Sequence, residues 1–204
     1  MTNVAIIIPA RYESSRFPGK PMAEISGKSL LHRTVEAARE VKGVHGIHVA
    51  TDDNRIVRHA LTFEAIAIET SSECRNGTER VAEAADKLLE AADLIINLQG
   101  DAPLTPPWFI EALIDAMIDD DSVAMATPAV RLTAETYEGF VSDRRAGRVG
   151  GTTVVFDTLG DALYFSKEVI PYLPADAVDQ LDTVPVYHHV GVYAYRPNLL
   201  QRYM

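Results

Sequence analysis

Short apolar runs, separated by stretches with helical spacing, organise the first 122 residues of the chain. The run from Val4 to Ile8 is continuous, mostly β-branched, and ends at Pro9. Further strand-like runs lie at Ile47 to Ala50, Ala65 to Ile68 and Leu94 to Leu98. Continuous apolar strands are typically covered on both faces and belong to parallel sheets. The pattern therefore predicts an open, mostly parallel sheet.

Helices are predicted between these runs, and each has a residue suited to begin it. Ser29, one residue of the pair Asp52-Asp53, and Asn76 each stand where a helical pattern starts. Thr105-Pro106 is an N-cap and first-turn pair ahead of a fourth helix, whose apolar residues recur at helical spacing. Alternating strands and helices predict a Rossmann-like, doubly wound α/β fold.

From about Val123 the pattern changes to strands with few helical signals. The strand candidates of this half are Val123 to Pro128, Thr152 to Phe156, Ala162 to Phe165 and Val190 to Tyr195. Segments without a clear pattern lie around Ser142 to Gly151 and Pro174 to Pro185. Because 204 residues suit one domain, we predict that residues 1–122 form one half of it and residues 123–204 a strand-rich lobe.

The composition argues against some classes of partner. Hydrophobic residues make up 47% of the chain and charged residues 24%, the balance of a globular protein with a packed core. A net charge of -10 makes nucleic acid an unexpected partner. Cys74 is the only cysteine, so no intramolecular disulfide forms, and the first apolar run is too short for a signal peptide or membrane span. We expect a cytoplasmic protein without a membrane partner.

The loop after the first predicted strand, Pro9 to Pro21, carries three cations within ten residues. Ligands bind at this position in open α/β sheets. Gly19 would let the backbone approach a ligand closely, and Arg11, Arg16 and Lys20 could surround a triphosphate. Alternatively, the loop is solvated and its cations pair with surface carboxylates. The loop lacks the glycine and lysine spacing of a P-loop, and taken alone it favours neither alternative.

Within this loop the chain resembles the CMP-Kdo synthetases (3-deoxy-manno-octulosonate cytidylyltransferases). Their signature Pro-Ala-Arg-x-x-Ser-x-Arg-x-Pro-Gly-Lys-Pro is matched at every fixed position. Similar family segments follow in order at Val49 to Asp53, Asn76 to Arg80, Asn97 to Asp101, Ala162 to Lys167 and His189 to Tyr193. The resemblance covers nearly the whole chain. It implies that CMP is transferred from CTP to Kdo, an eight-carbon sugar acid, for lipopolysaccharide biosynthesis.

The resemblance also implies roles for the nucleotide-binding residues. Arg11, Arg16 and Lys20 would bind the phosphates, and Arg16, Lys20 and Asp101 would be the catalytic residues, with Lys20 stabilising charge on the α-phosphate. Asp101 would bind the cofactor Mg²⁺, although a turn before Pro103 also explains an aspartate there. The implied nucleotide contacts also include Pro9, Ala10, Gly19, Asn76, Gly77, Thr78 and Gln99. Selectivity for cytosine would rest on an acceptor such as the backbone carbonyl near Pro9 or Ala10.

The sugar acid is expected to bind the strand-rich half. The resemblance implies contacts from Tyr164, Lys167, His189 and Tyr193, with Lys167 facing the sugar carboxylate where the family usually has Arg. Judged on the residues alone, a His or Tyr in an apolar strand is more often part of the core. A homodimer is a further expectation from the family.

Two alternatives to Kdo activation remain open at this point. Arg16-Phe17-Pro18 and Pro185-Val186-Tyr187 also fit the branch that activates 8-amino-Kdo. In addition, the family's Val-Asp-Thr-Pro-Glu-Asp motif, which contains a second metal-binding aspartate, has no counterpart among the 204 residues. The sequence is therefore also compatible with a catalytically silent nucleotide-binding protein.

Overall fold

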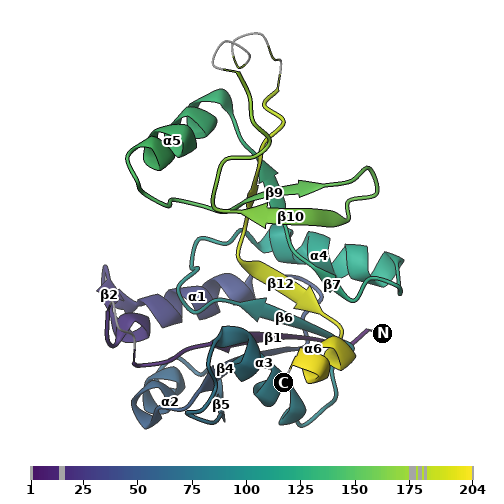
Figure 1. Cartoon of the computed structure of the whole chain (residues 1–204). Coiled ribbons are helices and arrows are strands. Elements are labelled where there is room, and N and C mark those ends of the chain that lie inside the picture. Colours follow the sequence, from purple (N-terminus) through teal and green to yellow (C-terminus); the bar gives the residue numbers. More distant parts are fainter. Residues whose placement is uncertain (1, 14–16, 175–177, 179–180, 182, 204) are drawn as a thin grey trace. The chain divides into compact units, whose positions relative to one another are not determined.

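The strands predicted in the first half form four adjacent strands of a six-stranded sheet (Figure 1). The sheet order is β5-β4-β1-β6-β12-β7. Its strands are β1 (Val4–Pro9), β4 (Gly46–Thr51), β5 (Ile66–Glu69), β6 (Leu94–Leu98), β7 (Met125–Ala126) and β12 (Val192–Tyr195). β1, β4, β5 and β6 are parallel, whereas β12 is antiparallel to both of its neighbours. The predicted doubly wound, mostly parallel α/β fold is confirmed.

The computed structural model describes residues 2–13, 17–174, 178, 181 and 183–203, and it divides into two compact units. Unit 1 comprises Met1–Ala126 and Val192–Met204, and unit 2 comprises Thr127–Gly191. The division falls a few residues after the predicted boundary at 123. The larger difference is that the last strand returns to unit 1, because β12 pairs with β6 of the first sheet.

Of the helices described in unit 1, four begin close to predicted capping residues and two, the first and the last, were not predicted. The helices are η1 (Lys20–Met22), α1 (Leu30–Arg39), α2 (Asn54–Leu61), α3 (Gly77–Asp86), α4 (Pro107–Asp119) and α6 (Pro197–Tyr203), beside the short hairpin β2 (Glu24–Ile25) and β3 (Lys28–Ser29). Ser29, Asp53 and Asn76 each accept a backbone N–H of the first turn, as predicted. The N-cap of α4 is Pro106 and not Thr105, because the helix begins one residue later.

Both faces of the sheet are covered. Ala5 and Ile7 of β1 pack with residues of α3 and α6 in one cluster, while Ile6 and Ile8 alternate with them and are equally buried. α1 and α4 lie on the other side of the sheet (Figure 1). In the described parts of the chain, no helix has the length and apolar character that crossing a membrane requires.

Unit 2 is an antiparallel sheet with a helix, and only part of it was predicted. The order β10-β9-β11-β8 is formed by β8 (Ala129–Arg131), β9 (Thr153–Phe156), β10 (Ala162–Ser166) and β11 (Tyr187–His189). β9 and β10 fall within one residue of the predicted runs. Helix α5 (Ala134–Arg145) was not predicted, and its last turn occupies the start of the supposedly irregular segment Ser142 to Gly151. Thr133 begins it through a capping box with Thr136.

Candidate active site

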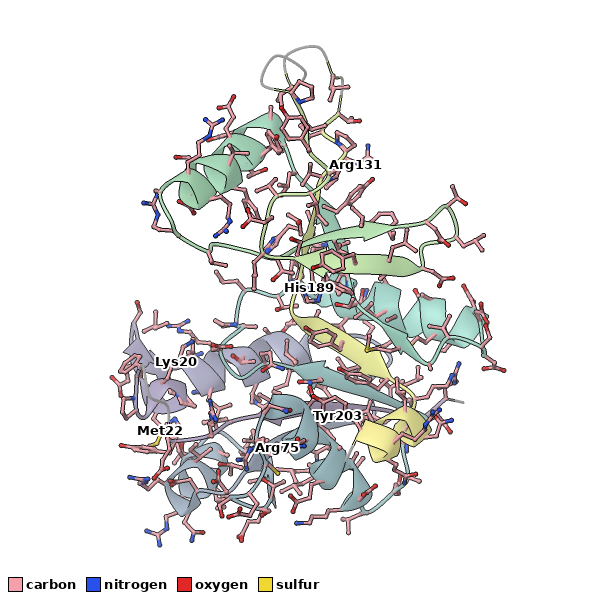
Figure 2. The ribbon with its side chains drawn as sticks, viewed as in Figure 1. Lys20, Met22, Arg75, Arg131, His189 and Tyr203 are labelled. Carbon is pink, nitrogen blue, oxygen red and sulfur yellow. The ribbon has the colours of Figure 1, made fainter. Side chains whose placement is uncertain are left out.

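A cleft of about 330 Å³ opens at the carboxyl ends of β1 and β6 in unit 1. The loops that follow these adjacent parallel strands leave the sheet at the same edge, so segments from different parts of the sequence converge there. The lining residues are Pro9, Ala10, Arg11, Lys20, Pro21, Cys74, Arg75, Asn76, Gly77, Arg80, Gln99, Gly100 and Asp101. Most of the predicted nucleotide-binding residues are therefore brought together from three separate segments. Figure 2 labels two of the lining residues, Lys20 on η1, which was predicted, and Arg75 just before α3, which was not.

The strand ends that form the floor of the cleft approach each other very closely. A Cβ atom added to Gly100 would lie 2.8 Å from the carbonyl oxygen of Pro9, so a side chain there would displace backbone. Ala10 donates its N–H to the carbonyl of Ala50 at 2.8 Å, which extends the β1–β4 pairing by one residue. Glycine at 100 is thus needed for close packing of the strand ends.

Gly19 has a conformational explanation that the sequence did not provide. Its φ of +71° is in the left-handed region, and an added Cβ would lie 3.2 Å from the ring of Tyr12. Gly19 also donates its N–H to the carbonyl of Tyr12 at 2.8 Å, which closes the loop before η1. The residue is not among those lining the cleft, so its contact with the nucleotide stays a prediction. Arg16 lies outside the described residues.

Lys20 and Asp101, two predicted catalytic residues, form an ion pair across the cleft. Their side chains are 43% and 48% exposed, so the pair is largely solvated and contributes only about 0.2–1 kcal/mol to stability. Lys20 comes from the loop after β1 and Asp101 from the turn after β6. Nucleotide or metal can therefore separate the two charges at little cost to the fold.

The start of α3 contributes two of its three predicted residues to the cleft. Asn76 caps the helix by accepting the N–H of Glu79 at 3.0 Å, and Gly77 packs against Gln99, whose Oε1 would lie 3.2 Å from an added Cβ. Thr78 does not line the cleft. Its side chain lies beside the hydroxyl of Tyr195 on β12. Burial raises the pKa of Tyr195 to about 12, so this hydroxyl stays protonated.

Among the described residues that line the cleft, Asp101 is the only one with a carboxylate side chain. No group of three or more His, Cys, Asp or Glu side chains suited to a metal is found among the residues that the structure describes. Mg²⁺ is commonly bound by one or two carboxylates together with substrate phosphates and water. A single half-exposed aspartate beside a cationic loop fits that mode and does not fit an ion bound by protein alone.

Three of the predicted sugar-binding residues lie in unit 2. Tyr164 on β10 is 64% exposed, and Lys167 donates to Thr152 Oγ1 at 2.6 Å. His189 lies 3.0 Å from Thr127 Oγ1 and packs edge-on against Phe165. Burial, followed by the charges of His188 and Lys167, lowers the pKa of His189, so its imidazole is neutral near pH 7.

Tyr193, the fourth predicted sugar-binding residue, belongs to unit 1 and not to the strand-rich lobe. It lies on β12 opposite Asn97 of β6 and stacks with Tyr195. Burial raises its pKa. The local sequence looked like part of the second lobe because β12 follows β11 by only a short turn, but its pairing partner is a strand nearly one hundred residues earlier.

Comparison with known proteins identifies the family. The family model described as cytidylyltransferase matches residues 5–204. The chain belongs to the cytidylyltransferase family. A relative within it, the 3-deoxy-manno-octulosonate cytidylyltransferase of Maricaulis maris (strain MCS10), is 44% identical over 98% of this chain and 75% of its own length. The Chlamydia pneumoniae protein of the same name is 40% identical over 97% of this chain and 72% of its own length.

A solved structure is also similar to this member of the cytidylyltransferase family. CMP:2-keto-3-deoxy-manno-octonic acid synthetase complexed with CTP superposes with a TM-score of 0.84 at 39% identity, covering 99% of this chain and 77% of the other. The resemblance inferred from the sequence motifs is therefore confirmed.

Arg80 is a cleft residue of this cytidylyltransferase to which the sequence analysis gave no role. Its side chain is 4% exposed and pairs with Asp52 at 3.1 Å, and it donates to Thr70 Oγ1 at 2.5 Å. Asp52 follows β4 and Thr70 follows β5, so one guanidinium connects two strand ends to α3. The sequence did contain a signal for this role, because Arg80 stands four residues after the helix cap Asn76, at a position that faces the core of a helix starting there.

Cys74 also lines the cleft, and we predict that its thiol is unreactive. Burial, and then the hydrogen bond to Glu83 at 3.2 Å, raise the pKa of Cys74 to about 11. About one thiol in a thousand is then ionised at pH 8, compared with about a quarter at the ordinary value of about 8.5. Alkylation by iodoacetamide at pH 8 should be slower than in urea-unfolded protein by about two hundredfold, the ratio of the two ionised fractions, and should accelerate up to about pH 11. Equal rates in folded and unfolded protein would contradict this.

Proposed function

We propose that the chain transfers CMP from CTP to 3-deoxy-manno-octulosonate, producing CMP-Kdo and pyrophosphate for lipopolysaccharide biosynthesis. The observation that carries this proposal is the cleft that combines Arg11, Lys20 and Asp101 where β1 and β6 end. Two findings support the choice of nucleotide and sugar. The chain belongs to the cytidylyltransferase family, and nearly its whole length is similar to a 3-deoxy-manno-octulosonate cytidylyltransferase and to a CMP:2-keto-3-deoxy-manno-octonic acid synthetase solved with CTP.

The proposed reaction is an in-line displacement at the α-phosphorus of CTP. A hydroxyl oxygen of the sugar acid forms a bond to phosphorus and loses its proton, while the bond to the β-phosphate breaks and pyrophosphate leaves. Negative charge grows on the phosphate oxygens during this step. Lys20 and Arg11 would offset that charge and hold the triphosphate in line.

Mg²⁺ is the proposed cofactor, with Asp101 as its protein ligand. Asp101 would hold the ion beside the triphosphate, where it would offset the negative charge that grows on the leaving group. Asp101 and Lys20 already form an ion pair in the cleft. When the triphosphate binds, Lys20 would move to the phosphates and release the carboxylate for the ion.

Base recognition is assigned to the floor of the cleft and the start of α3. Pro9, Ala10, Asn76, Gly77 and Gln99 all line the cleft, and a backbone carbonyl of Pro9 or Ala10 would accept from the base. We therefore expect CTP to bind more tightly than UTP or ATP in the presence of Mg²⁺, because cytosine presents an amine where uracil presents an acceptor. Calorimetric titration measures the three affinities. Equal affinities would contradict base recognition by these residues.

Turnover tests the reaction itself. Pyrophosphate release is measured with the full chain, CTP and Mg²⁺, with and without Kdo. Release that depends on Kdo supports the proposed function, whereas CTP binding without Kdo-dependent release contradicts it.

Unit 2 is the proposed location of sugar contacts from Tyr164, Lys167 and His189, and also of a dimer interface. β10 is an edge strand, and its Leu163 and Tyr164 are 67% and 64% exposed. An exposed apolar edge strand is a ready template for pairing with a second copy. Sedimentation equilibrium measures the mass in solution and so tests the homodimer. A monomer mass at all protein concentrations would contradict it.

The cytoplasm remains the proposed compartment.

A further inference from the structure

Asn97 is a polar residue in the most deeply buried strand of unit 1. Its neighbours on β6 are leucines and isoleucines, and all five residues of the strand are buried, with Asn97 0% exposed. The Nδ2 atom of Asn97 is buried and has no hydrogen-bond partner among the residues that the structure describes. A buried donor without a partner destabilises a fold. An apolar side chain would suit this position better, so stability does not explain the asparagine.

The carboxamide oxygen of Asn97 does have a partner in the cleft. It accepts a hydrogen bond from Nε2 of Gln99 at 2.7 Å. Residues two apart along an extended chain point to the same side, which places Gln99 next to Asn97 just beyond the end of β6. On its other side Gln99 packs against Gly77, where an added Cβ would lie 3.2 Å from Gln99 Oε1 and 3.6 Å from Nε2. Gln99 is therefore held between the buried strand and the start of α3.

We infer that Asn97 is a positioning residue that fixes the orientation of the Gln99 carboxamide. A glutamine side chain can rotate by half a turn and offer either its amine or its oxygen to a ligand. Because Nε2 is bonded to Asn97, Gln99 offers Oε1, an acceptor, in the cleft that it lines. The substrate group recognised there is therefore a hydrogen-bond donor.

Two donors are available in the substrates of the proposed function, on which this inference rests. One is the exocyclic amine of cytosine, which uracil replaces with a carbonyl oxygen. The other is a hydroxyl group, either of the sugar acid or of the ribose in CTP. Both would bond to Gln99 Oε1. If the carboxamide turned, the bond to the cytosine amine would be lost, and the hydroxyl would have to accept from Nε2 instead of donating.

The Asn97→Leu variant separates positioning from a structural role. Leucine has a similar branched shape but is larger than asparagine; it removes the unpartnered donor and leaves Gln99 free to rotate. A positioning role predicts an unchanged or higher melting temperature together with weaker substrate binding. A purely structural role predicts the opposite, a lower melting temperature with substrate binding intact in the folded fraction. Asn97→Val serves as the second variant should the leucine side chain not fit.

The experiment compares wild type, Asn97→Leu, Gln99→Ala and the double variant by calorimetry with CTP and UTP in Mg²⁺, and by the KM for Kdo. We expect Asn97→Leu to weaken the binding of one substrate about fivefold. In the Gln99→Ala background it should have no further effect, because both substitutions act through one contact. A CTP:UTP affinity ratio that falls toward one identifies the cytosine amine. A higher KM for Kdo with unchanged CTP affinity identifies the sugar hydroxyl.

Unchanged binding of both substrates by Asn97→Leu, or an effect that adds to that of Gln99→Ala, would overturn the inference while leaving the proposed function in place. A wild-type chain that does not bind CTP would overturn the proposed function, and the inference with it.

Discussion

The Asp101→Asn variant should release pyrophosphate about a thousandfold more slowly than wild type. Asparagine keeps the size of the side chain but removes the negative charge that an oxygen ligand of Mg²⁺ provides. The ion would then be poorly placed to offset charge on the triphosphate, an effect worth several kcal/mol in the transition state. The fold should be nearly unaffected, because Asp101 is 48% exposed and its ion pair with Lys20 is solvated.

Binding of Mn²⁺ in the presence of CTP, followed by electron paramagnetic resonance, gives a second measurement that does not depend on turnover. Asp101→Asn should weaken it strongly. Asp115→Asn is the matched control, since Asp115 is an exposed carboxylate on α4 outside the cleft. An Asp101→Asn protein with wild-type rate and Mn²⁺ affinity would exclude Asp101 as the metal ligand.

The Lys20→Met variant should have effects of opposite sign on catalysis and on metal binding. Turnover should fall about a hundredfold, because methionine retains the length of the side chain but cannot neutralise charge on the phosphates. Without CTP, however, Mn²⁺ should bind up to about fivefold more tightly, since Asp101 no longer has a competing cation.

Lys42→Met provides the control for Lys20, because Lys42 is exposed and lies outside the cleft. It should change neither turnover nor Mn²⁺ binding. If Lys20→Met left Mn²⁺ affinity in the nucleotide-free chain unchanged or lower, Lys20 would not compete for Asp101 in solution. If turnover also stayed at the wild-type rate, the catalytic role of Lys20 would be wrong.

Much of the cleft could be predicted because its residues lie in short motifs next to strong strand signals. Lys20 follows the first apolar run, and Gln99 and Asp101 follow the fourth, so the carboxyl-edge rule for open sheets brings them together. Arg80 was missed for a physical reason. Its importance comes from burial beside Asp52 and Thr70, which are distant in sequence and become neighbours only when the strands align.

Thr78 and Gly19 show a different limit of motif-based prediction. Both belong to segments that match the family, yet the side chain of Thr78 lies beside Tyr195, and Gly19 adopts a left-handed φ next to the ring of Tyr12. A motif identifies a segment that matters, but it does not show which member faces the ligand and which supports the backbone. The direction in which each side chain points depends on how its segment packs against other elements.

In unit 1 the local pattern was sufficient for β1, β4, β5 and β6 and for the caps Ser29, Asp53 and Asn76, because buried strands and helix starts depend on residues close in sequence. The partner of β12 was decided by tertiary structure. The sequence of a short apolar strand does not indicate which strand it will pair with. Tyr193 belongs to unit 1 because β12 pairs with β6. Helix α5 likewise depends on its surroundings, since Tyr137 is its only residue classed as buried and its sequence has little helical periodicity.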